Sequence, residues 1–182
     1  NSFSCSGYSV RFDGDRLVTA GIDDNLFSDY TPGSGGIKMD IVRLKYFYVR
    51  RNNFYGLKDP VYVFASGTAG IQFEQKIFRI KDNHFYDITG AAIMLRHGGT
   101  GGIHMDVNDI KIENNTVHSG ISPSYGVFIW NGATTNATFD YDSIRIAGNV
   151  VNLAGAAAGI MVWMTGIDSV ANMEITENTI TG

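Results

Sequence analysis

The sequence predicts an all-β protein, a right-handed parallel β-helix with three short strands per coil. An asparagine motif recurs at a nearly constant interval, and each interval carries further short strands after a glycine or a loop. Apolar residues alternate with polar ones, and β-branched and aromatic types dominate, which is typical of strands rather than amphipathic helices. Internal repetition at this period is typical of a solenoid.

The repeated motif has the form apolar-x-apolar-x-x-Asn-x-apolar. Its five copies contain Asn52, Asn83, Asn115, Asn149 and Asn178, and subtraction gives spacings of 31, 32, 34 and 29 residues. The first residues of the chain match the end of the same motif. In stacked coils, one Asn per turn hydrogen-bonds along the stack, so we expect these side chains to form an inward ladder at a turn.

Two further strands complete the predicted coil. The second strand is expected at 61–64, 93–96, 127–130 and 160–163, and the third at 71–74, 103–106 and 137–140. Alternation turns one apolar set inward on each strand and leaves the other set outside. A β-propeller of similar period would need four strands per blade and hairpin turns, which are scarce here.

The length of 182 residues fits one domain. The stretch at about 13–40 is rich in Gly, Asp and Ser, and predicts a protruding loop. Because the chain begins and ends in mid-pattern, we expect it to be a fragment of a longer solenoid.

Composition excludes several classes of function. The 14 basic and 18 acidic side chains leave a net charge of −4, which argues against nucleic-acid binding. No apolar run approaches the roughly 18 residues needed for a membrane span. The single cysteine, Cys5, cannot form an internal disulfide, and the sequence contains no zinc-ligand pattern.

Alternation on the second strand predicts two outward columns that are mostly large and apolar. They are Tyr62, Met94, Phe128 and Met161, and then Phe64, Arg96, Trp130 and Trp163. Such a surface fits a contact covered by a loop or by another chain of an oligomer, or a platform for sugar rings. As substrate-binding candidates we take Tyr62, Phe64, Phe128, Trp130 and Trp163, with Lys76 as a cation that favours an acidic glycan.

The third strand predicts an outward acidic column of Glu74, Asp106 and Asp140, beside a column that contains His104. Carboxylates on adjacent coils would lie roughly 5 Å apart, and those two coils apart roughly 10 Å. These separations approach those of retaining and inverting glycosidases, and crowding would raise the pKa of one carboxyl so that it acts as an acid. A solvated acidic stripe or a Ca²⁺ site explains the same residues without catalysis.

Arg96 and His97 are further catalytic candidates. An outward arginine beside aromatic rings binds a carboxylate bidentately, and a histidine carries protons near neutral pH. A surface ion pair for Arg96 and a hydrogen-bonded strand-end histidine for His97 are the structural alternatives. We expect Arg96 to lie in a glycan groove with His97 and His104 within the reach of one coil.

Three consecutive segments carry a family resemblance. Gly-Ala-Ala-Ile-Met-Leu-Arg-His-Gly at 90–98, Ile-Glu-Asn-Asn at 112–115 and Tyr-Gly-Val-Phe-Ile-Trp at 125–130 resemble features of the chondroitinase B and alginate lyase family. The resemblance implies a pectate-lyase-like right-handed β-helix and a catalytic role for Arg96 at an acidic sugar. Family members also carry a lysine base and calcium-binding glutamates on the preceding coil, which the strand at 61–66 lacks.

These observations predict a carbohydrate-active protein that acts on a polysaccharide. It would be a lyase that uses Arg96, or a glycoside hydrolase that uses acids such as Glu74, Asp106 and Asp140. The alternatives are a phage tailspike or fibre segment, which implies a homotrimer, and a non-catalytic adhesin solenoid that binds glycans. All of these hypotheses place the protein outside the cell, secreted or on a virion surface.

Overall fold

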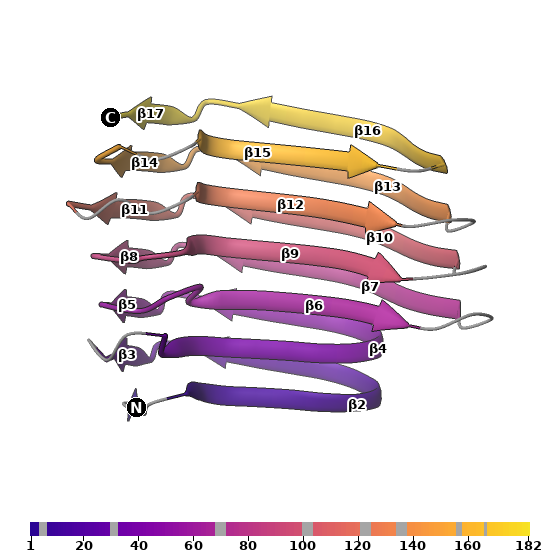
Figure 1. Ribbon diagram of the computed structural model, residues 1–182, viewed down its shortest axis with the longest axis horizontal. Helices are drawn as coiled ribbons and strands as arrows, with labels where there is room; N and C mark the ends of the chain where they lie inside the picture. Colours follow the sequence, from indigo (N-terminus) through magenta and orange to yellow (C-terminus); the bar gives the residue numbers. More distant parts are fainter. Residues whose placement is uncertain are drawn as a thin grey trace.

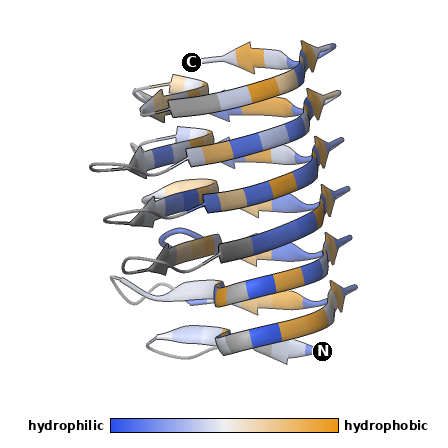
Figure 2. Ribbon diagram, turned by 90° about the vertical axis from the view of Figure 1, so that its right-hand side faces the viewer, coloured by the Kyte–Doolittle hydropathy of each residue, from blue (hydrophilic) through white to orange (hydrophobic). Residues whose placement is uncertain are grey.

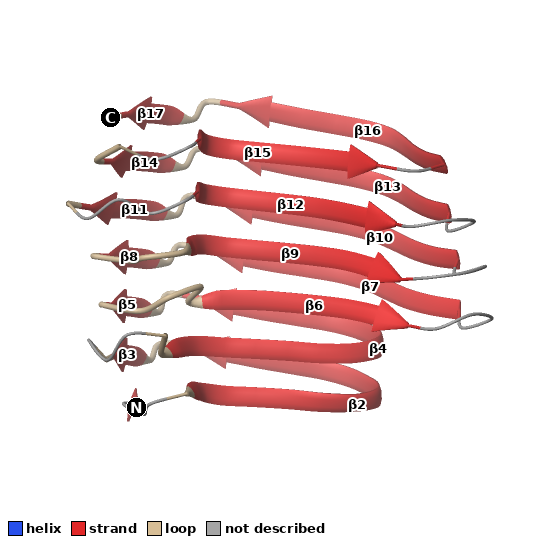
Figure 3. Cartoon of the chain, viewed as in Figure 1, coloured by secondary structure: helices blue, strands red, loops and turns tan. Residues whose placement is uncertain are grey.

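The computed structural model describes residues 1–3, 7–29, 33–67, 72–99, 104–120, 125–133, 138–155, 158–165 and 167–182. Within them the chain forms 17 strands, which stack into a parallel β-solenoid with the two termini at opposite ends (Figure 1). The predicted all-β class and the three strands per coil are confirmed (Figure 3). No helix in the described ranges has the length and apolar character that would let it cross a membrane.

One sheet is built from the short strands that follow the asparagine turns. Its members in spatial order are β1 (Ser2–Phe3), β3 (Leu26–Ser28), β5 (Asn53–Tyr55), β8 (His84–Tyr86), β11 (Thr116–Ser119), β14 (Val150–Leu153) and β17 (Thr179–Thr181). Phe27, Phe54 and Phe85 stack inside this sheet, with ring centroids 4.8 and 4.9 Å apart. Each ring occupies the same position of its coil, so the stacked rings stabilise this register of the strands.

The second sheet has two limbs that face each other across the core. The β9 limb contains β6 (Val61–Gly67), β9 (Ala91–Gly99), β12 (Tyr125–Ala133) and β15 (Ala158–Thr165). The β10 limb contains β7 (Gln72–Lys81), β10 (His104–Glu113), β13 (Thr138–Ala147) and β16 (Ile167–Thr176). The long strand β4 (Gly35–Arg50) belongs to both limbs, because it pairs with β6 and then with β7.

The prediction of a protruding loop at about 13–40 was wrong for most of this segment, which forms strands. Strand β2 (Tyr8–Asp23) covers its first part, and β3 and the start of β4 cover much of the rest. Residues 30–32 lie outside the described part of the chain. The Gly- and Asp-rich segment therefore completes the first coils, and β2 pairs in parallel with β4 from Tyr8 to Asp23.

The asparagine ladder is confirmed, and it also includes Asn25, whose Oδ1 accepts a hydrogen bond from Asn1 Nδ2. The Oδ1 atom of each Asn accepts hydrogen bonds from both the backbone N–H and the Nδ2 of the preceding Asn. This holds for the five successive pairs formed by Asn25, Asn52, Asn83, Asn115, Asn149 and Asn178. The residue before each ladder Asn has a left-handed backbone, for example φ 54° at Arg51 and 65° at Gly148, which makes the sharp turn.

Alternation determines which side chains are inside. Figure 2 shows hydrophilic and hydrophobic residues alternating along the long strands. The inward set forms one continuous apolar core between the limbs and the short sheet, with Val61, Ile93 and Val127 at most 1% exposed. The outward set is consequently aligned from coil to coil into columns, and these columns position the candidate site.

Candidate functional site

A column of charged side chains runs along the outside of the β10 limb, with one member from each coil. The strand registers place Arg16 beside Arg43, Arg43 beside Glu74, Glu74 beside Asp106, and Asp106 beside Asp140. The predicted register of the three acidic residues is confirmed. The column is therefore basic at one end and acidic at the other, and its neighbouring members are about 4.8 Å apart along the stack.

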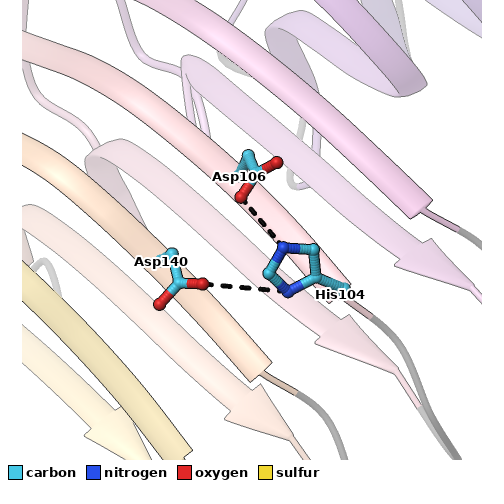
Figure 4. Close-up of side chains that lie close together, drawn as sticks. All are labelled: His104, Asp106 and Asp140. Carbon is cyan, nitrogen blue, oxygen red and sulfur yellow. Dashed lines mark ion pairs between the residues drawn. The ribbon is translucent and has the colours of Figure 1, made fainter.

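Three side chains meet in the acidic part of this column. His104 Nε2 lies 3.1 Å from Asp106 Oδ1, and His104 Nδ1 lies 3.8 Å from Asp140 Oδ2 (Figure 4). The imidazole therefore bridges two carboxylates, and one N or O atom from each residue falls within 4.8 Å of the others. Ser169 Oγ also donates a hydrogen bond of 2.5 Å to Asp140 Oδ1. The side chains of His104, Asp106 and Asp140 are 41, 53 and 38% exposed, so an external substrate can reach them.

Glu74 has a different environment from the other two acids. Lys76 Nζ lies 2.6 Å from Glu74 Oε1. This hydrogen bond, with smaller contributions from the positive charges of Arg43 and Arg16, lowers the pKa of the Glu74 carboxyl. The expectation that crowding would raise a pKa is wrong for Glu74, because its nearest charged neighbours are cations. Glu74 stays ionised near neutral pH and suits binding rather than proton donation.

A groove of about 580 Å³ adjoins the acidic cluster. Its lining includes three aliphatic side chains and six charged ones, namely Arg16, Arg43, Lys45, Glu74, Lys76 and Asp106. Asp106 belongs both to the groove and to the histidine–carboxylate cluster, so the two features form one continuous surface on the β10 limb.

Arg96 lies on the other limb, between two aromatic rings. Its Cζ atom is 4.2 Å from the centroid of the Trp130 ring and 5.4 Å from that of Phe64. The predicted column of Phe64, Arg96, Trp130 and Trp163 is confirmed in register. Trp163 is 47% exposed, and Arg96 Nε is buried with no hydrogen-bond partner among the described residues.

The second aromatic column on the β9 limb is also in register. Tyr62 pairs with Met94, Met94 with Phe128, and Phe128 with Met161. The Phe128 ring stacks on Tyr125 with centroids 4.4 Å apart. The outside of this limb therefore presents rings and methionines around a single guanidinium.

His97 faces the interior of the solenoid, which agrees with the predicted alternative of a hydrogen-bonded histidine rather than with a proton carrier at the glycan groove. The side chain is fully buried, with Nδ1 2.8 Å from Tyr141 Oη and Nε2 3.1 Å from Gln75 Oε1. The amide oxygen only accepts, so Nε2 carries the proton and the tyrosine hydroxyl donates to Nδ1. Desolvation lowers the pKa of His97 to about 4, so the imidazole is neutral at neutral pH. Alternation explains the placement, because the strand that turns Arg96 outward turns His97 inward.

The predicted site residues thus fall into separate groups rather than one groove. Arg96 and the aromatic side chains lie on the β9 limb, and His104 lies with the carboxylates on the β10 limb. Within the described part of the chain, the ring contacts of Arg96 are with Phe64 and Trp130. The expected grouping of Arg96, His97 and His104 does not occur in the structure.

Two arginines of the column, Arg16 and Arg43, were not identified from the sequence. Arg16 lies in the coil that ends at Asn25, which was included in the predicted loop. Arg43, in contrast, lies nine residues before Asn52, as Glu74 lies nine residues before Asn83. The signal was present, because Ala20, Ile22, Asn25 and Phe27 follow the spacing of the repeat. Alanine in the first apolar position weakened that match.

The donor set of the cluster bears on the Ca²⁺ hypothesis. Ca²⁺ takes six to eight oxygen ligands, whereas His104, Asp106 and Asp140 offer an imidazole and two carboxylates. Such mixed donors are typical of transition metals. The two ring nitrogens of His104 also face different carboxylates, which is the arrangement of a proton-sharing bridge.

Comparison with known proteins identifies the family of the chain but no individual relative. The family described as "Right handed beta helix region" matches residues 1–180. Neither the curated proteins nor the solved structures gave a match. The match is to this general family, and it does not extend to the chondroitinase B and alginate lyase family.

Proposed function

Because the chain belongs to the right-handed β-helix family, whose fold commonly serves carbohydrate-active proteins, we propose that it binds a polysaccharide along the β10 limb and cleaves it. The observation that carries the proposal is the exposed cluster of His104, Asp106 and Asp140 beside a charged groove. A repeating outward column suits a repeating polymer, because each coil presents a side chain at the same register.

The cluster has the parts required for acid–base cleavage of a glycosidic bond. Retaining glycosidases hold two carboxyl groups about 5–5.5 Å apart, and one carboxylate oxygen of Asp106 lies within 4.8 Å of one of Asp140. Asp140 is the nucleophile in this proposal. Asp106 and His104 share the proton that passes to the glycosidic oxygen, since their polar atoms are 3.1 Å apart.

The reaction would then have two steps. In the first, the proton moves from the Asp106–His104 pair to the leaving oxygen, the bond from C1 to that oxygen breaks, and Asp140 bonds to C1. In the second, the same pair removes a proton from water, the water oxygen bonds to C1, and Asp140 is released. Glu74, held ionised by Lys76, contributes hydrogen bonds to sugar hydroxyls rather than a proton.

A panel of polysaccharides tests this proposal, with two products measured together. New reducing ends without ultraviolet absorbance from unsaturated sugars are expected for hydrolysis, whereas an equal rise of both signals would indicate a lyase. Asp140→Asn and Asp106→Asn should each lower the rate by at least about 100-fold. Asp142→Asn is the matched control, since Asp142 is an exposed acid on the same strand. Cleavage that survives Asp140→Asn unchanged would refute the assignment.

The aromatic side chains on the outside of the β9 limb support a second proposal, that this limb also binds glycans. Trp130 and Trp163 lie one coil apart, and Trp163 offers an exposed ring to the apolar face of a sugar. A non-catalytic adhesin would use this surface alone, and a tailspike would bury it between the chains of a homotrimer. Tryptophan fluorescence titrated with oligosaccharides, together with sedimentation, separates these cases. We also propose that the protein acts outside the cell, where polysaccharides of this kind occur.

A further inference from the structure

We propose that Arg16 and Arg43 form a subsite for the carboxylate of a uronic acid, so that the polysaccharide bound by the β10 limb is acidic. This inference rests on the proposed function for the location of the glycan, and it adds the chemical class of the sugar. It depends on three observations: the two arginines lie side by side without ion-pair partners, the groove has a positive local charge, and the arginines lie at a suitable distance from the cluster of His104, Asp106 and Asp140.

The first observation is that neither guanidinium group has an ion-pair or aromatic partner among the described residues. Among the described residues, the other arginines are in ion pairs, except Arg96, which lies between aromatic rings. Arg16 and Arg43 have neither kind of contact there, and both side chains are exposed. They are direct neighbours on β2 and β4 in the paired register, so their forks project from adjacent coils on the same face.

The second observation is the local charge. Four cations and two carboxylates line the groove, which leaves a local charge of +2 in a chain whose net charge is −4. Lys76 is bonded to Glu74, and Lys45 lies 5.2 Å from the centroid of the Tyr46 ring. With Lys76 and Glu74 neutralising each other, the excess positive charge is carried by Arg16, Arg43 and Lys45, which are opposed only by Asp106 among the lining residues. The field of the two arginines reaches the neighbouring carboxylate, because both contribute to the lowered pKa of Glu74.

The third observation is the order of residues along the column. Arg43 precedes Asp106 by two coils, so the two residues are roughly 10 Å apart along the solenoid axis. A glycan lying along the axis would place one acidic sugar on the arginines and a nearby glycosidic bond on the cluster. A guanidinium fork matches a planar carboxylate with two parallel hydrogen bonds, which a lysine does not provide.

Binding measurements test this subsite apart from cleavage. Calorimetry on the whole chain carrying Asp140→Asn compares a polyuronate oligomer, a sulfated glucan and a neutral glucan of similar length. We expect the polyuronate to bind most tightly, and more weakly at high salt. Arg16→Gln and Arg43→Gln should each weaken polyuronate binding by about tenfold, and Arg43→Lys should restore only part of it. Arg145→Gln is the control, because Arg145 on the same limb is already paired with Glu113 and Glu174.

The outcomes separate the two proposals. Equal binding of the neutral glucan and the polyuronate, or polyuronate binding unchanged by both glutamine variants, would overturn the subsite. Preferential binding of the sulfated glucan would overturn the carboxylate assignment. Arginine-dependent polyuronate binding without cleavage of any polysaccharide by the unmodified chain would support the subsite and refute the proposed activity.

Discussion

Replacing Asn115 by alanine should destabilise the solenoid more than any exposed asparagine does. Asn115 is 1% exposed, and its Oδ1 accepts hydrogen bonds of 3.0 Å from both the backbone N–H and the Nδ2 of Asn83. Its Nδ2 donates to Ile80 O at 2.9 Å and to Asn149 Oδ1 at 3.0 Å. The substitution removes all four bonds.

The magnitude follows from what the removal leaves behind. The backbone N–H of Asn83 loses the acceptor it has in the ladder, whereas Asn83 Nδ2 keeps its bond to Val49 O and Asn149 Oδ1 keeps its bond from the Asn115 backbone. One buried donor without a partner costs about 1–3 kcal/mol, and the weakened amides add to this. We therefore expect a loss of about 2–3 kcal/mol in the free energy of unfolding.

Urea unfolding followed by circular dichroism measures this loss, since the midpoint falls while the slope is unchanged. Asn152→Ala is the matched control, because Asn152 is an exposed asparagine on the neighbouring strand β14. A loss below about 0.5 kcal/mol, equal to that of the control, would show that the ladder contributes nothing to stability.

Three further predictions concern the interior. Burial lowers the pKa of His97 to about 4, whereas the imidazole of the unfolded chain titrates near 6.5. Between these two pH values only the unfolded chain binds this proton. The free energy of unfolding therefore falls as pH decreases from 6.5 to 4. The loss, up to about 3 kcal/mol, should disappear in His97→Gln when urea midpoints are compared across pH. Asn131→Val should raise stability by about 1–2 kcal/mol in the same assay, since the buried Asn131 amide has no hydrogen-bond partner among the described residues; a loss would show that the amide is satisfied. Gly126→Ala should lower the melting temperature, because the added Cβ would lie 2.5 Å from the Gly159 carbonyl oxygen, while Gly120→Ala, with nothing within 4 Å, should not.

The sequence predicted the repeat because its inward positions are physically restricted. A ladder Asn is needed wherever one amide must serve the coils on both sides, so Asn83 and Asn115 could be aligned without a structure. The first coils were missed because β2 and β4 pass from one limb to the other without a loop. Their ladder spacings are therefore only 24 and 27 residues, from Asn1 to Asn25 and on to Asn52.

The site was only partly predictable. Alternation alone gave the registers of Asp106 with Asp140 and of Arg96 with Trp130, because both pairs lie on regular strands. It did not show that the two pairs lie on opposite limbs, since the angle between strands depends on the corner residues. The same alternation had the information to place His97 inside, where Tyr141 from the facing limb satisfies it.

Inward and outward positions make different contributions, and this makes the functional tests interpretable. The inward columns provide the buried area and the ladder, so substitutions there alter folding. Asp106 and Asp140 make exposed contacts, and exposed ion pairs contribute about 0–1 kcal/mol to stability. Their asparagine variants should therefore unfold at nearly the wild-type urea concentration, and a lost activity would be assigned to chemistry. A carboxylate variant that unfolds early would instead show that the column stabilises the coils, and the acidic cluster would then be a structural network.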